Sequence, residues 1–121
     1  MELFTKDQIA RLLANGRAST EAIEREGNTP DHVPVVKLFT PDANATWLIS
    51  EIDPHRPDVA FGLADLGMGC PELGSVSIPE LGAIRGALGL PVERDLHITL
   101  DQPLSVYAEW ARRHGHIVTC R

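Results

Sequence analysis

Four runs of strand-forming residues follow one another in the middle of the chain, and only short links separate them. The runs cover residues 33–39, 46–52, 59–65 and 72–77, and they are rich in β-branched, aromatic and leucine residues. Each link has six residues and contains Pro, Asp or Gly. Parallel neighbours would need a crossover of about a dozen residues or more. We therefore expect an antiparallel β-meander.

A helix is predicted before the strands. Thr5 and Gln8 have the spacing of a capping box, which satisfies free backbone N–H groups at a helix start. Glycine readily adopts the left-handed conformation that ends helices, so we expect this helix to stop at Gly16. Residues 17–32 are polar and poorly periodic, which indicates a connector with a short helical turn near 20–26.

Two further helices are predicted after the strands. One begins near Ser77 and ends by Gly89, and another covers residues 103–113 and ends at Gly115. Between them, residues 95–99 are expected to form a short fifth strand. The predicted fold is α+β: an antiparallel meander sheet of four to five strands, packed with one N-terminal and two C-terminal helices, in a single domain over residues 1–121.

Composition limits the classes to which this protein can belong. The 121 residues include 17 acidic and 11 basic side chains, for a net charge of -6, and 43% are hydrophobic. No apolar stretch approaches the roughly 20 residues of a membrane span, and the start lacks a basic-then-apolar signal layout. We expect a cytoplasmic protein with no membrane association, in which Cys70 and Cys120 remain thiols.

The negative charge is concentrated in the middle of the chain. Residues 31–80 carry eight acidic and two basic side chains, and lysine occurs only at positions 6 and 37. This distribution disfavours binding to phosphate backbones and favours a basic protein partner. Nucleic-acid binding is the weakest of the readings, and it would use Arg94, Arg112, Arg113 and Arg121, which follow the acidic segment.

Three of the acidic residues lie at or next to the ends of predicted strands. Alternation along a strand directs Glu51 and Asp53 to the same side, and Asp65 on the next strand is expected to join them. Such a cluster would bind a divalent cation or supply an acid–base pair. The alternative is the ordinary solvent face of a one-sided sheet, which is polar by default.

Other residues of metal-binding or catalytic type have ordinary structural explanations. His114, His116 and Cys120 resemble zinc ligands in spacing, but the tail supplies no fourth ligand. His97 has no visible nucleophile partner, and Cys70 lies in a Gly-rich turn without a nearby base. We therefore predict no catalytic residue, no metal and no cofactor, and leave open whether these side chains have a role.

Several sequence runs resemble a known family. They are PVVKLFTPDANATWL at 34–48, DVAFGL at 58–63, PELG at 71–74 and LGLPVERD at 88–95. Together they resemble the bacterial domain-of-unknown-function family 2958 over about residues 8–110. The resemblance implies a small proteobacterial protein of the kind carried on plasmids and integrated elements, with no activity or catalytic residues to transfer.

The leading hypothesis is a non-enzymatic, protein-binding accessory module of a mobile genetic element, acting against host defence through an acidic surface. Lys37 is expected to pair with Glu51 across the hairpin or to face the partner, and Asn44 suits a positive-φ turn position. The alternative is a small metal-dependent, hydrolase-like enzyme using Glu51, Asp53, Asp65 and His97. The expected partner-binding residues are Lys37, Asp42, Asn44, Glu51, Asp53 and Asp65.

Overall fold

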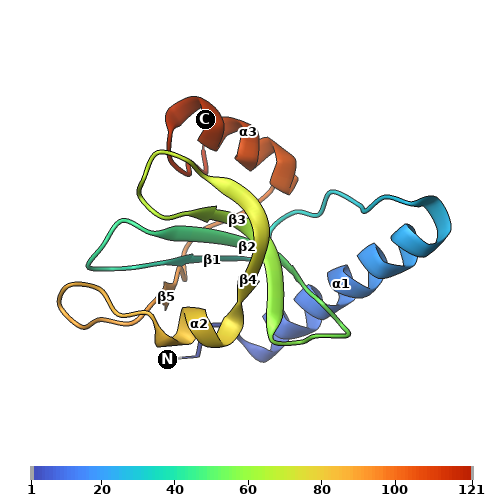
Figure 1. Cartoon of the computed structure of the whole chain (residues 1–121), viewed down its shortest axis with the longest axis horizontal. Coiled ribbons are helices and arrows are strands. Elements are labelled where there is room, and N and C mark those ends of the chain that lie inside the picture. Colours follow the sequence, from blue (N-terminus) through green and yellow to red (C-terminus); the bar gives the residue numbers. More distant parts are fainter. Residues whose placement is uncertain (1, 121) are drawn as a thin grey trace.

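The computed structural model describes residues 2–120 and has an α+β fold (Figure 1). Its sheet is antiparallel, with the strand order β4-β3-β2-β1-β5. The predicted meander is confirmed, because β1 to β4 are neighbours in chain order. In chain order the elements are α1 (Lys6–Glu26), β1 (Val36–Phe39), β2 (Thr46–Ile52), β3 (Val59–Asp65), β4 (Glu72–Ser77), α2 (Ile78–Ala83), β5 (Glu93–Arg94) and α3 (Leu104–His114).

The sheet separates two apolar clusters. Trp47 and Ile49 of β2 pack in the larger cluster with Leu12 of α1 and Leu81 of α2. Their neighbour Leu48 points to the opposite side and packs against α3, as alternation along a strand requires. Figure 1 accordingly shows α3 on one side of the sheet and α1 and α2 on the other.

The first helix begins as predicted but continues ten residues beyond the expected end. Thr5 and Gln8 form the capping box, and the helix runs through Gly16 to Glu26. It ends at Gly27, which has φ 80°. The prediction of a connector is therefore wrong for residues 17–19, and the helical turn predicted near 20–26 is the last part of α1. Gly16 is needed for close packing rather than for a turn, since a Cβ there would lie 1.8 Å from the Ile52 carbonyl oxygen.

The segments outside the meander differ from prediction in extent. The second helix ends at Ala83 rather than Gly89, because the chain turns into a tight loop closed by the Gly86 N–H and the Leu90 carbonyl. The fifth strand is Glu93–Arg94 rather than 95–99, and it pairs with β1. The position of this strand depends on its pairing with β1, which lies far away in the sequence. No non-glycine residue among 2–120 has a positive φ, so the prediction for Asn44 is wrong.

The last helix matches its prediction closely. It runs from Leu104 to His114 and ends at Gly115, which has φ 77°. Pro103 provides no side-chain cap at its start, but Asp31 accepts hydrogen bonds there from the Ser105 backbone N–H and hydroxyl. The segment that follows α1 is thereby attached to the start of α3. Among residues 2–120, no helix has the length and apolar character needed to span a membrane.

Candidate functional site

A β-bulge decides where Glu51 points. The register between β2 and β3 shifts at Ser50, so that Glu51 stands opposite Phe61. In an unbroken ladder Glu51 would stand opposite Ala60, which is buried in the larger apolar cluster. Bulges commonly redirect a side chain in this way. Here the bulge keeps a carboxylate out of the core and places it beside an exposed aromatic ring.

The end of β2 has an open edge, and α1 covers it. The pairing with β1 ends at Ile49, so the last three residues of β2 have no strand on that side. The Asn15 side chain donates a hydrogen bond of 2.9 Å to the Ser50 carbonyl, and Gly16 packs against the carbonyl of Ile52. The buried backbone acceptor of Ser50 is thus satisfied by a helix side chain. This contact brings the second half of α1 alongside Glu51.

Ser19 and His32 form a hydrogen-bonded chain with Glu51. The Ser19 hydroxyl donates to Glu51 Oε1 at 3.1 Å, and Ser19 Oγ lies 3.0 Å from His32 Nε2. A serine hydroxyl carries one proton, so with that proton directed at Glu51 it is His32 Nε2 that donates to Ser19. These hydrogen bonds join three parts of the protein: α1, β2 and the segment that follows α1. They hold the Glu51 side chain in one orientation.

The environment raises the pKa of Glu51 above its ordinary value. Burial is the main cause, because it disfavours the charged carboxylate, and the neighbouring Asp53 charge acts in the same direction. The hydrogen bond from Ser19 and the proximity of His32 oppose this effect and favour the charged form. A cationic group entering the site would favour the charged form further.

Two hollows open beside Glu51, and together we call them the Glu51 groove. The larger is about 330 Å³ and includes Ile23 and Asp53 in its wall. The smaller is about 220 Å³ and includes Leu73. Both are lined by Glu51 and Phe61. The Phe61 and Leu73 side chains are 36% and 48% exposed, so the groove combines accessible apolar surface with a half-buried carboxylate.

The groove brings together only two of the predicted acidic residues. Glu51 and Asp53 line the larger hollow as expected. Asp65 does not join them, because it pairs with Thr46 at the other end of β2. Its carboxylate is buried and accepts hydrogen bonds of 2.9 Å from the backbone N–H groups of Gly67 and Ile117. The prediction that Asp65 completes the cluster is wrong, since this side chain holds a turn and the C-terminal segment in place.

The remaining predicted partner-binding residues lie elsewhere. Lys37 pairs with Asp95 at 3.7 Å rather than with Glu51. Asp42 accepts hydrogen bonds from the backbone N–H groups of Leu88 and Leu90, and so fixes the loop between α2 and β5. Asn44 is exposed and lines a separate hollow of about 540 Å³ near the C-terminal segment.

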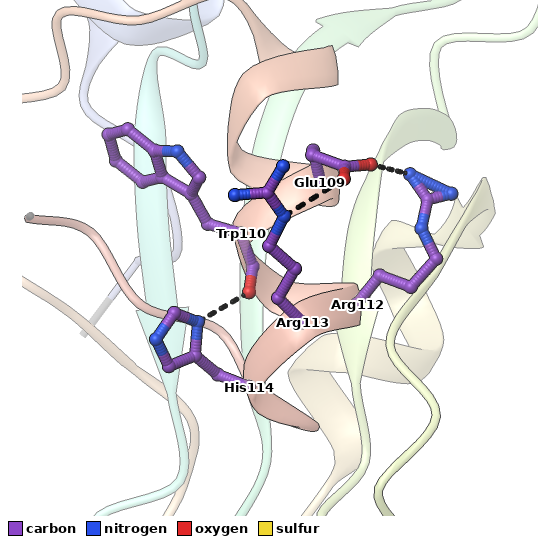
Figure 2. Close-up of polar contacts among 5 residues, drawn as sticks. All are labelled: Glu109, Trp110, Arg112, Arg113 and His114. Carbon is purple, nitrogen blue, oxygen red and sulfur yellow. Dashed lines mark hydrogen bonds and ion pairs between the residues drawn. The ribbon is translucent and has the colours of Figure 1, made fainter.

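The basic end of α3 is partly neutralised within the helix. Figure 2 shows the Glu109 carboxylate between Arg112 and Arg113, and both ion pairs are formed. His114 Nδ1 donates to the Trp110 carbonyl at 2.8 Å, so one of its two ring nitrogens is already in use. Of the other two arginines in the nucleic-acid hypothesis, Arg94 donates a hydrogen bond to the Glu2 carbonyl, and Arg121 lies outside the described residues.

The described histidine and cysteine side chains of the C-terminal segment are not arranged as a metal site. Within residues 2–120, no group of three or more His, Cys, Asp or Glu side chains is arranged to hold a metal ion. His116 Nδ1 donates to the His114 carbonyl, and Cys120 is exposed. His97 uses its backbone N–H to bond Asp95, and Cys70 is an exposed free thiol.

Sequence reasoning missed Ser19 and His32. Both fell inside the segment predicted as a connector, where residues have no assigned face. The signal was nevertheless present, since Leu12, Gly16 and Ser19 follow the helical spacing and form the buried face of α1. An extension of the helical pattern through Gly16 would have placed Ser19 on the surface that meets the sheet.

Comparison with known proteins yields a family and no functional relative. No curated protein and no solved structure matches the chain at a significant level. The family described as proteins of unknown function (DUF2958) matches residues 3–118. Since this match covers nearly the whole chain, the protein belongs to the DUF2958 family.

Proposed function

We propose that this protein is a non-enzymatic binding module, and that its Glu51 groove receives a basic segment of a partner protein. The observation that carries the proposal is the half-buried Glu51 carboxylate, which lines one hollow together with Asp53 and the exposed Ile23 and Phe61 side chains. An apolar wall with a few fixed polar groups is typical of binding sites. The negative charge selects a cationic ligand group.

The overall charge supports a protein partner rather than nucleic acid. The net charge of -6 repels phosphate backbones, and two of the exposed arginines, Arg112 and Arg113, already pair with Glu109. The setting that we propose is the cytoplasm, where the protein would serve a mobile genetic element as an accessory or anti-defence factor. This setting rests on the family resemblance of the sequence runs.

A direct test measures binding of short peptides to the purified protein by fluorescence anisotropy, at about 0.15 M salt. We expect arginine- and lysine-containing peptides to bind and charge-reversed peptides not to bind. Glu51→Gln should weaken binding of the basic peptides by about tenfold, since it removes a partly desolvated charge. Glu80→Gln is the matched control, because it makes the same charge change on the exposed surface of α2.

Two results would overturn the proposal. One is that no basic peptide binds more tightly than its acidic counterpart. The other is that Glu51→Gln and Glu80→Gln weaken binding equally, because the effect would then come from net charge alone. Circular dichroism of both variants checks that the fold is retained.

A second candidate function is an acid–base enzyme, and the Ser19–His32–Glu51 chain favours it. Of the carboxylates in the hydrolase hypothesis, only Glu51 and Asp53 share a hollow. The Ser19 side chain is only 4% exposed, so its hydroxyl is poorly placed to attack a substrate. A divalent-cation titration distinguishes this candidate: specific thermal stabilisation that Glu51→Gln abolishes would favour the enzyme over the binding module.

A further inference from the structure

The two hollows of the Glu51 groove differ in chemistry. Glu51 lines both hollows, but Asp53 lines only the larger one, and Leu73 and Leu104 line only the smaller one. The other titratable side chains of the smaller hollow are already bonded within the protein, Asp31 to Ser105 and His32 to Ser19. They share Thr29, Glu51 and Phe61, so the hollows are adjacent and the phenyl ring lines both. A ligand that fills both must therefore present a charged group and an apolar group side by side.

Each carboxylate in the larger hollow has one oxygen already engaged. Glu51 Oε1 accepts from Ser19, and Asp53 Oδ1 accepts from the His55 backbone N–H at 2.9 Å. Among residues 2–120, the second oxygen of each carboxylate has no hydrogen-bond donor within the protein. Two separate acceptors beside an aromatic ring suit a guanidinium better than an ammonium, since its N–H groups spread over a plane that also stacks on aromatic faces.

The walls of the groove are fixed before any ligand enters. The Ser19–His32 contact holds the segment after α1 against the helix, and Asp31 and the His32 carbonyl bind the first turn of α3. These contacts tie three parts of the chain to the base of the groove. A preformed site loses little conformational entropy on binding. The fixed spacing of the two hollows therefore restricts which ligands can fill both.

Resting on the function proposed above, we infer that the partner contributes an extended segment with an arginine and an apolar residue two positions apart. Alternate side chains of an extended chain emerge on one side, about 6.6 Å apart, which suits two adjacent hollows. The arginine enters the larger hollow, stacks on Phe61 and meets Glu51 and Asp53. The apolar side chain enters the smaller hollow against Leu73.

The inference is tested with short peptides of equal net charge that differ in one feature. The reference peptides contain Arg-Ser-Leu or Leu-Ser-Arg, since either chain direction satisfies the spacing. Replacement of arginine by lysine, of leucine by serine, or of the spacing by an adjacent Arg-Leu pair should each weaken binding by about fivefold to tenfold. Equal affinity for the lysine and arginine peptides, or for all spacings, would overturn the inference and leave the proposed function standing.

Protein variants assign each preference to its hollow. Leu73→Ser should abolish the preference for leucine over serine but keep the preference for arginine over lysine. Asp53→Asn should do the reverse, since Asp53 lines only the larger hollow. Leu66→Ser is the matched control, since Leu66 is an exposed leucine in the turn after β3, outside the groove. If Leu66→Ser and Leu73→Ser act alike, the smaller hollow is not the apolar subsite and the inference fails. If no basic peptide binds at all, the proposed function fails with it.

Discussion

The contact between Gly16 and β2 gives a quantitative prediction for Gly16→Ala. The added Cβ would lie 1.8 Å from the Ile52 carbonyl oxygen, whereas contacts below 3.0 Å are essentially never seen. The helix must therefore move away by about 1.2 Å or distort the strand. A backbone carbonyl in a sheet cannot rotate aside as a flexible side chain would. The close approach of α1 to the open edge of β2 depends on this glycine.

The expected loss of stability follows from three effects. Overpacking against rigid backbone costs about 1–3 kcal/mol. The same movement stretches the 2.9 Å hydrogen bond from Asn15 to Ser50, which contributes about 1 kcal/mol. Alanine favours a helix interior over glycine by about 1 kcal/mol, and this gain opposes the other two effects. We expect Gly16→Ala to lower the free energy of unfolding by about 2 kcal/mol.

Urea unfolding followed by circular dichroism measures the effect. Gly82→Ala is the control, because Gly82 lies in α2 with open space around its Cβ position. That variant should be more stable than the wild type by about 0.5–1 kcal/mol, through the lower entropy of its unfolded chain. A Gly16→Ala protein as stable as Gly82→Ala would refute the packing argument. A Gly16→Ala protein with wild-type stability but a weaker helical signal would also contradict the packing argument. In that protein α1 would end near Gly16, and the loss of its contact with β2 would have cost no stability.

Three other perturbations have defined outcomes. Asp42→Ala should increase hydrogen exchange of the backbone amides in the 86–90 loop, because the carboxylate that accepts from two of them is lost; unchanged protection would show that the loop holds itself. Tyr107→Phe should cost about 1–3 kcal/mol in thermal unfolding, since the buried hydroxyl accepts from the Asp101 N–H; a change near zero would contradict this. For Glu51, the raised pKa means that the folded state binds the proton more tightly, so this group's contribution to the free energy of unfolding falls as pH rises through that range. Measured at about pH 4 and about pH 7, the stability of wild type relative to Glu51→Gln should decrease, and an increase would refute the assigned shift.

Local signals were sufficient to predict most of the secondary structure. The capping box at Thr5 and Gln8 acts over three residues, and the glycine stop at Gly115 acts over a single turn. The short links between strands likewise leave no room for a crossover, so the meander topology follows from the length of these links. Each of these features depends only on residues close together in the sequence, so the sequence is enough to predict it.

The candidate site depended on contacts that no local pattern shows. Gly16 has the local character of a helix terminator, but it lies inside α1. It packs on β2, and its helix neighbours Asn15 and Ser19 donate hydrogen bonds to the same strand. The bulge at Ser50 is a property of the pairing between two strands, and it alone turns Glu51 toward Phe61. Strict alternation correctly grouped Glu51 with Asp53, because the two lie on the same side of the bulge.

The sequence by itself determined which residues are acidic and which segments are strands or helices, because charge and local propensity belong to each residue and its neighbours. Only the tertiary structure decided which carboxylates remain available. Asp42 and Asp65 each bind backbone N–H groups distant in sequence, 48 and 52 residues away at the furthest. Glu51 was left beside a groove, because α1 and the segment after it close around the open end of β2.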